Sequence, residues 1–348
     1  MASMGRVEYI VLPQMLTVAR GFEEGRYQGV FARYVSLAWA EVSARTVVRS
    51  LRVLRGTRIV AVGGATLGGS GKTPLAIACA RELARGGTRV ALVGHAYRAR
   101  PGRARIVSTF DPLAEVGDEA LVAAHALEAQ GVRVVVAPSR SGAVELAARH
   151  ADVLVLDGVL QLTPARAFLS LLAVDAEEPW GRAEAVPPRG DLRAPMAALL
   201  AATDMVVRIG ERPADARILS LGAERGGTII PWATLRSLRI GVACALARPH
   251  RLLRFLARRG VTPVALARAG DHTDVPARAL LGKVDLWLAT RKCSFHVPSH
   301  VPIATIHHEL ELDPSVSARL TSCMGGGREP SGRASHGIAH LDPRRRRQ

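Results

Sequence analysis

The chain has few aromatic residues and few cysteines, and no export signal is visible in its sequence. Phe, Trp and Tyr make up 4% of its 348 residues, so the core must be built mainly from Ala, Val and Leu. The four cysteines are widely spaced and form no CxxC pair. This argues against a zinc site or a disulfide framework and fits a reducing compartment. No basic-then-apolar signal-peptide pattern opens the sequence, so we expect a chain that is not exported.

Lysine is almost absent, although the formal net charge is +17. Lys72, Lys283 and Lys292 are the only lysines, and the other 44 of the 47 basic residues are arginine. A basic surface attracts phosphates, anionic lipid or nucleic acid. Because no basic stretch is interleaved with aromatic residues, lipid and phosphate are favoured and no nucleic-acid partner is expected. No pattern indicates an obligate protein partner.

The stretch from about Tyr27 to Arg55 lacks the run of about 20 apolar residues that a membrane span needs, because arginines interrupt it. Its apolar residues still recur at helical spacing, and they include Phe31, Tyr34 and Trp39. A basic amphipathic helix with aromatic residues can lie in the membrane interface. It can equally be an ordinary helix packed on the domain, and the pattern leaves both interpretations open.

Apolar runs alternate with helical stretches through the rest of the chain, which predicts a parallel sheet with helices on both faces. The predicted strands are residues 58–62, 89–93, 133–137, 153–156, 169–174 and 205–209. The predicted helices include residues 74–85, 119–130 and 141–150. A second, smaller α/β set is predicted from strands at 239–246, 262–267 and 286–290 and a helix at 249–259.

The clearest motif lies between the first predicted strand and the first predicted helix. It reads Thr66-Leu67-Gly68-Gly69-Ser70-Gly71-Lys72-Thr73 and is followed by Pro74. Glycines let backbone amides surround phosphate oxygens, and the helix N-terminus adds its positive dipole end. Lys72 would reach the β- and γ-phosphates, and the Thr73 hydroxyl would bind Mg²⁺. The motif therefore predicts a P-loop that binds a nucleoside triphosphate, with Thr66 in place of the usual first Gly.

A glycine-rich turn without a ligand is the alternative, and Lys72 argues against it, because this chain uses arginine nearly everywhere else. A second metal ligand should be an acid at the end of a later buried strand. Asp157 stands there, directly after the apolar run 153–156. An Asp at a strand end can also cap a turn, but beside a P-loop the magnesium role is favoured.

These patterns divide the chain into five parts and predict an α/β fold of the P-loop NTPase class. The parts are an N-terminal amphipathic helix, expected to associate with a membrane on the interfacial interpretation (1–56), a P-loop core (57–210), a linker (211–234), a second, smaller α/β domain (235–322) and a basic tail (323–348). The tail is rich in Gly, Ser and Arg, a composition typical of disorder, and its arginines could contact anionic lipid.

The sequence resembles the tetraacyldisaccharide 4'-kinase family, P-loop kinases that phosphorylate the lipid A disaccharide precursor. The family's phosphate loop resembles Gly-Asn-Leu-Thr-Val-Gly-Gly-Thr-Gly-Lys-Thr-Pro, and residues 64–74 follow it, with the Thr and the trailing Pro in place. Further blocks match in order over roughly residues 30–312: Val116-Gly117-Asp118-Glu119, Asp157-Gly158-Val159-Leu160-Gln161, Pro188-Arg189-Gly190-Asp191-Leu192-Arg193-Ala194-Pro195, Ala247-Arg248-Pro249, Gly270-Asp271-His272 and Thr290-Arg291-Lys292.

The resemblance implies transfer of a phosphoryl group from ATP, with Mg²⁺, to the 4'-hydroxyl of a tetraacyl glucosamine disaccharide 1-phosphate. It also implies a peripheral enzyme on the cytoplasmic face of the bacterial inner membrane. The residue roles that it implies are deprotonation of the hydroxyl by Asp118 with His272, Mg²⁺ binding by Thr73, Asp157 and Glu119, and substrate binding by Arg193, Lys292 and Gln161, with Arg140 as a further candidate. Judged without the family, Asp118 could equally be a helix N-cap, and a lone histidine such as His272 is usually an exposed loop residue.

The chain departs from the family pattern at several places. Gly158 replaces the second Asp of the acidic pair, Leu162 replaces its terminal His, Thr273 replaces the second His of a pair, Cys293 replaces an acid, and residues 94–98 differ from the usual Ser-Arg-Gly-Tyr-Gly. These changes concern substrate positioning and metal geometry more than nucleotide binding. An active, divergent kinase is the first interpretation. A degenerate nucleotide-binding homologue without kinase activity and another P-loop small-molecule kinase or NTPase are the alternatives.

Overall fold

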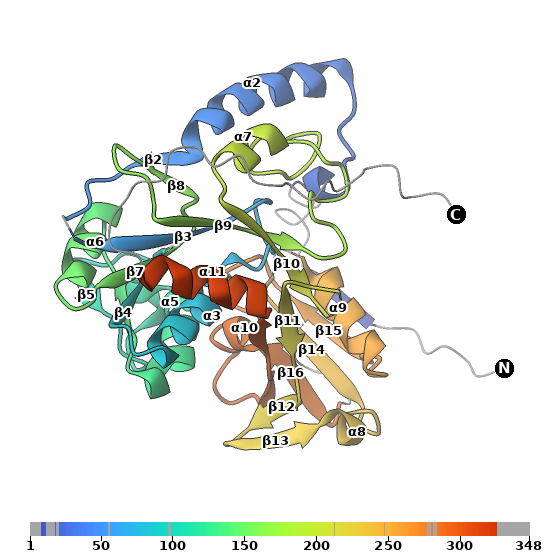
Figure 1. Cartoon of the computed structure of the whole chain (residues 1–348). Helices are drawn as coiled ribbons and strands as arrows, with labels where there is room; N and C mark the ends of the chain where they lie inside the picture. The colour runs from blue at the N-terminus through green and yellow to red at the C-terminus, as the bar shows by residue number, and fades with distance from the viewer. Residues whose placement is uncertain are drawn as a thin grey trace.

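The computed structural model describes residues 8–11, 18, 21–54, 56–96, 99–211, 213–246, 248–276, 280 and 284–325. Two sheets with their helices form two units (Figure 1). The first unit, with the larger sheet, lies at the upper left of the figure, and the second lies at the lower right. Across the described ranges, no helix has the length and apolar character needed to cross a bilayer.

The first unit is built on a nine-stranded sheet in the order β18-β11-β10-β9-β3-β7-β4-β6-β5. Its strands are β3 (Arg58–Gly64), β4 (Val90–Val93), β5 (Arg105–Ile106), β6 (Arg133–Val136), β7 (Val153–Asp157), β9 (Leu169–Asp175), β10 (Met205–Gly210), β11 (Ala216–Leu219) and β18 (Glu309–Leu312). Neighbours from β11 to β6 are parallel, and the edge strands β18 and β5 are antiparallel. The predicted parallel sheet is confirmed.

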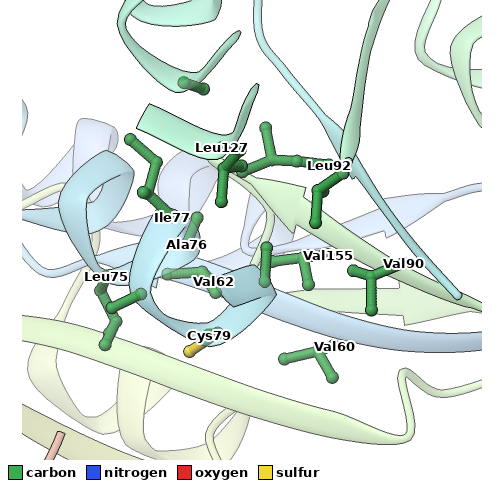
Figure 2. Close-up of a cluster of buried hydrophobic side chains, with 14 of the residues drawn as sticks. Val60, Val62, Leu75, Ala76, Ile77, Cys79, Val90, Leu92, Leu127 and Val155 are labelled. Carbon is green, nitrogen blue, oxygen red and sulfur yellow. The ribbon is translucent and has the colours of Figure 1, made fainter. Parts of the chain in front are cut away.

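Helices cover both faces of this sheet. Successive residues of a strand point to opposite sides, so each strand contributes apolar side chains to both helical layers. Val60 and Val62 of β3 pack under one set of helices, and Ile59 and Ala61 pack toward the other face. Figure 2 shows the first cluster, in which Leu75, Ala76, Ile77 and Cys79 lie beside the strands. The helices are α3 (Lys72–Arg85), α4 (Leu113–Val116), α5 (Asp118–Leu127), α6 (Arg140–Ala148), α7 (Met196–Ala201) and α11 (Pro314–Gly325), with a 3₁₀ turn, η1 (Glu128–Gln130).

The second unit is built on a seven-stranded sheet in the order β1-β15-β14-β16-β17-β12-β13. Its strands are β1 (Glu8–Val11), β12 (Gly222–Arg225), β13 (Thr228–Pro231), β14 (Ile240–Cys244), β15 (Ala265–Arg268), β16 (Leu286–Thr290) and β17 (Ile303–Ile306). Its helices are α8 (Trp232–Leu235), α9 (Pro249–Arg258) and α10 (Arg291–Ser294). Its four central strands, β15, β14, β16 and β17, are parallel, as expected for a second α/β domain.

The boundaries between the units differ from the predicted ones. Residues 211–234 are not a separate linker, because they contain β11 of the first sheet and β12 and β13 of the second. The chain crosses between the sheets at Ser220–Leu221 and returns at His307–His308. Strand β18 and helix α11 therefore belong to the first unit, although they were predicted in the second. Strand β1 lies within the predicted N-terminal part, residues 1–56, but it pairs with β15 and so belongs to the second sheet.

The N-terminal helix α2 (Val30–Thr46) is shorter than the predicted stretch, and β2 (Val48–Ser50) follows it and pairs with β8 (Gln161–Thr163). The face of α2 that packs on the rest of the unit is narrow: Ala32, Ser36 and Ser43 are buried, and the Ser36 hydroxyl donates to the Val186 carbonyl at 2.9 Å. Most of its large apolar side chains face outward, with Phe31 82% and Tyr34 68% exposed. The tail predicted for residues 323–348 lies outside the described residues from 326 onward.

Candidate active site

The P-loop joins β3 to α3, and its glycines are favoured by a left-handed backbone and by close side-chain neighbours. Gly69 and Gly71 have φ values of +67° and +82°, in the left-handed region. A Cβ on Gly64 would lie 2.0 Å from Ser70 Oγ, and one on Gly71 would lie 2.6 Å from Ile209 Cδ1. Thr66, which replaces the usual Gly, is buried and donates from Oγ1 to the Gly68 carbonyl at 2.9 Å. The variant residue therefore closes the turn with a side-chain bond.

Lys72, at the first turn of α3, lies between two acids. Its Nζ lies 3.2 Å from Glu119 Oε2 and 3.8 Å from Asp157 Oδ1. Burial lowers the pKa of Lys72, but the carboxylates of Asp157 and Glu119 outweigh burial and raise it above its ordinary value. The ammonium therefore stays charged where phosphate oxygens would lie.

The predicted metal ligands converge beside this lysine. Asp157 ends the buried strand β7 and accepts from Thr73 Oγ1 at 2.6 Å. Its other oxygen, Oδ1, is buried and has no hydrogen-bond partner within the described part of the chain. Hard oxygen donors of this kind fit Mg²⁺, which keeps few protein ligands and shares phosphate oxygens and water. In the described ranges no group of three or more His, Cys, Asp or Glu is arranged around a metal position, which is compatible with such an open site.

Asp118 and His272, which lie 154 residues apart, meet across the two units. Asp118 is the first residue of α5, and His272 follows β15 of the second unit. His272 Nδ1 lies 2.8 Å from Asp118 Oδ1 and 2.7 Å from Oδ2. The His272 side chain is only 7% exposed, and Gly117 takes the N-cap position. The contact rules out both the helix-cap and the exposed-loop interpretations.

Lys292, at the start of α10, lies on the other nitrogen of this imidazole. Its Nζ lies 3.0 Å from His272 Nε2 and 3.0 Å from Asp271 Oδ1. An ammonium only donates, so Nε2 accepts and Nδ1–H donates to the Asp118 carboxylate. With Nε2 as the acceptor from Lys292, the ring is in the form that can take up a proton; Asp271 Oδ2 lies farther from the same nitrogen, at 3.4 Å.

His296 is a site residue that the sequence did not reveal. Its Nε2 lies 2.9 Å from Asp118 Oδ2, and its Nδ1 lies 3.2 Å from Asp274 Oδ1. Burial raises the pKa of Asp118, but hydrogen bonds from His272 and His296 dominate and hold it well below its usual range. No motif includes His296, and only the fold brings it to Asp118.

The remaining predicted residues, Arg193, Arg140 and Gln161, lie in different surroundings. Arg193 lines the cavity, and its buried Nε has no hydrogen-bond partner in the ranges described. Arg140 Nη1 donates to the Asp157 carbonyl at 2.9 Å, which fixes the end of β7. Gln161 is 4% exposed and its amide is bonded to Ser170 Oγ and to backbone N–H groups of Leu162 and Ala167. The Gln161 side chain is therefore part of the core and not of the cavity wall.

His95 also lines the cavity, on the side of Arg140. Burial, together with the charges of Arg140 and Lys72, lowers the pKa of His95 to about 4. The imidazole is therefore neutral at physiological pH.

A cavity of about 1350 Å³ contains the P-loop, Glu119, His272 and Lys292, so the site lies between the units. Helix α9 of the second unit forms its wall next to the phosphate loop, where Arg251 Nη1 donates to the Gly69 carbonyl at 2.5 Å. The cavity also extends along Arg49 and Leu51, just after α2. Its volume exceeds the roughly 300–1000 Å³ of common small-molecule sites, which leaves room for a nucleotide and part of a second substrate.

A phosphate loop that faces an imidazole–carboxylate pair across an interdomain cleft defines a P-loop phosphotransferase. The family model of tetraacyldisaccharide-1-P 4'-kinases matches residues 30–286. The chain belongs to this family, and it is a kinase.

Named relatives agree with this membership. The chain is 32% identical over 308 residues to the tetraacyldisaccharide 4'-kinase of Methylobacterium nodulans, covering 83% of this chain and 86% of the relative. It is 28% identical over 254 residues to that of Allorhizobium ampelinum, covering 71% and 72%. The fold is similar to the solved structure of LpxK from Aquifex aeolicus in complex with ATP, with a TM-score of 0.63 and 17% identity, covering 84% of this chain and 98% of that one.

Proposed function

We propose that this kinase transfers the γ-phosphoryl group of ATP to the 4'-hydroxyl of tetraacyl glucosamine disaccharide 1-phosphate. Family membership supports the reaction, and the contact between Asp118 and His272 is the observation that carries the mechanism. Phosphoryl transfer asks the protein for positioning and charge neutralisation, together with a base for the attacking hydroxyl. The cavity between the two units brings these groups together.

The proposed base is His272, with Asp118 as its partner. The Nε2 lone pair of His272 takes the proton of the 4'-hydroxyl as that oxygen attacks the γ-phosphorus, the bond from this phosphorus to the β–γ bridging oxygen breaks, and ADP leaves. Asp118 then stabilises the imidazolium, since its carboxylate already accepts from Nδ1 at 2.8 Å. Lys292 now lies on Nε2, so the hydroxyl takes the place of its ammonium, which keeps Asp271 as an ion partner.

The proposed phosphate site is the P-loop, with its amides around the β- and γ-phosphates and Lys72 against their oxygens. Thr73 and Asp157, with Glu119 close by, would hold Mg²⁺, which neutralises phosphate charge during transfer. Arg193 is proposed to bind an anionic or polar group of the acceptor, because it lines the cavity and its buried Nε has no hydrogen-bond partner in the described ranges.

The proposed location is the cytoplasmic face of the inner membrane, with α2 against anionic lipid. Phe31 and Tyr34 face outward on a helix that also carries Arg33 and Arg45, the combination typical of an interfacial helix. Arg49 and Leu51, which line the cavity, come shortly after α2 in the chain. A lipid held at the membrane by α2 would therefore present its sugar headgroup to the cavity.

The reaction is tested by incubating the purified chain with γ-labelled ATP and the tetraacyl disaccharide 1-phosphate in detergent micelles. We expect label at the 4' position of the lipid and transfer slowed by about 10²–10⁴-fold in the Asp118→Ala/His272→Ala double variant. The degenerate-homologue alternative, motivated by Gly158 and Leu162, predicts nucleotide binding without any labelled lipid. Label released only as inorganic phosphate would instead indicate an NTPase.

A further inference from the structure

We propose that His296 is a positioning residue, which fixes the carboxylate of Asp118 so that it holds the base His272 in its reactive orientation. The inference rests on the proposed role of His272 in the kinase reaction. It concerns a residue outside every sequence motif of the site, and the geometry of four side chains carries it.

The pair of Asp118 and His272 does not fix its own geometry. His272 Nδ1 lies 2.8 Å from one carboxylate oxygen and 2.7 Å from the other, so rotation of the carboxylate would keep one contact or the other. His296 removes this freedom, because its Nε2 lies 2.9 Å from Oδ2 alone. With two imidazoles as donors, the plane of the carboxylate is fixed, and so is the direction in which His272 presents Nε2.

The surroundings of His296 make it a cation. Both of its ring nitrogens lie against carboxylate oxygens, Nε2 against Asp118 and Nδ1 against Asp274 at 3.2 Å. Ionised carboxylates only accept, so both nitrogens donate and the ring is an imidazolium. Burial lowers the pKa of His296, but the two carboxylates outweigh burial and raise it. A cation beside Asp118 keeps that carboxylate ionised, so that a proton taken from the substrate stays on His272.

The fold holds His296 on the same short segment as Lys292. Its N–H donates to the Cys293 carbonyl at 3.0 Å, and its own carbonyl accepts from Val275 at 2.8 Å. The neighbouring Phe295 stacks on His125 of α5 with ring centroids 6.0 Å apart. Helix α10 and the following turn therefore place one cation on each member of the Asp118–His272 pair, and their contact with α5 fixes the distance between the units.

The test is a double-mutant cycle of four proteins: the parent, His296→Ala, His272→Ala and the double variant. We expect His296→Ala to lower kcat by about 10- to 100-fold and to leave KM for ATP within about threefold. In the His272→Ala background the same substitution should change kcat by less than about threefold, because a positioning residue acts only through the base. A loss of equal size in both backgrounds would show general damage to the site and would overturn the inference.

Conservative variants show whether His296 acts as a hydrogen-bond donor to Asp118 or only fills space. His296→Gln keeps a donor near the position of Nε2 and should restore kcat to within about threefold of the parent, whereas His296→Asn, which is too short to reach Asp118, should not. These two variants also decide the matter if His296→Ala does not fold. The exposed His300 on the next turn is the matched control, and His300→Ala should behave as the parent.

The outcomes separate this inference from the proposed function. Parent-like kcat in both His296→Ala and His296→Asn, with kcat still reduced in His272→Ala, would overturn the positioning role and leave the base in place. Full activity of His272→Ala would remove the base itself, and the positioning role would fall with it.

Discussion

At the scale of single residues, Lys72 is the side chain on which nucleotide binding depends most. Its ammonium is held by Glu119 and Asp157 and keeps its charge despite burial. Lys72→Ala should lower kcat/KM for ATP by more than about 100-fold, since one preorganised charge against the transferring group is worth at least that much. Calorimetric titration with ATP and Mg²⁺ checks the binding part. Lys292→Ala is the comparison, and it should lower kcat while ATP still binds.

The pH dependence of stability should report the charge of His296. Its folded pKa is raised, above an unfolded value of about 6.5. The bonds to Asp118 and Asp274 therefore contribute their full stability below about pH 6.5 and are lost as pH rises through the folded pKa. The difference in unfolding free energy between the parent and His296→Gln should be largest in acid and should shrink with rising pH, as measured by urea unfolding. A constant difference would mean that the ring is neutral throughout.

Gly158 is a departure from the family pattern whose cost can be measured. It has a φ of +80°, and a Cβ there would come no closer than 3.8 Å to a neighbour, Arg140. Gly158→Ala should therefore destabilise the fold by about 1–2 kcal/mol through backbone strain alone. Gly102, which has open space and no left-handed backbone, is the control, and Gly102→Ala should be neutral or slightly stabilising. Thermal unfolding of both variants decides between these expectations.

The residue roles could be predicted from the sequence only where a local motif carries them. Thr73 and Asp157 follow from strand, loop and helix order, and the structure places them 2.6 Å apart. Gln161 shows the limit, because its place in a motif does not reveal that its amide is bonded inside the core. His296 shows a second limit: it lies in no motif, and only tertiary contacts bring it to Asp118.

At the scale of elements, six of the nine strands of the first sheet were predicted to within one or two residues, and β5, β11 and β18 were not predicted. Buried parallel strands are continuous apolar runs, as in 153–156, and they are visible without partners. Strands β1, β12, β13 and β18 lie toward the edges of the sheets, and their short sequences carry no such signal. Which sheet an edge strand joins depends on pairing with distant residues, so the unit boundaries could not be read from periodicity.

Helix α2 carries the membrane prediction. Phe31 and Tyr34 are 82% and 68% exposed, so replacing both by Ser should leave the fold unchanged. Burying one large apolar side chain is worth about 1.5–3 kcal/mol, and the double substitution should weaken binding to anionic vesicles by at least about tenfold. Flotation assays at two salt concentrations check this. Phe110→Ser is the control, because Phe110 is 94% exposed in another part of the molecule and should not matter.

At the scale of the whole molecule, the active site exists only where the two units meet. The P-loop, Asp157 and Asp118 belong to the first unit, and His272 and Lys292 belong to the second. After β3, the described chain crosses between the sheets at two short segments, 220–221 and 307–308, and β1 near the N-terminus adds a further strand to the second sheet. The order of the family blocks along the sequence indicated that both units contribute to one site, but the distance between them needed the three-dimensional fold.

The central claim is that Asp118 and His272 act as one unit in deprotonating the acceptor hydroxyl. The measurement that tests it most directly is kcat for Asp118→Ala, His272→Ala and the double variant with the disaccharide lipid, together with the Kd for ATP. We predict a loss of about 10²–10⁴-fold in each single variant, a double variant little worse than the poorer single one, and ATP binding close to that of the parent. Parent-like turnover in His272→Ala, or losses that multiply in the double variant, would contradict the account.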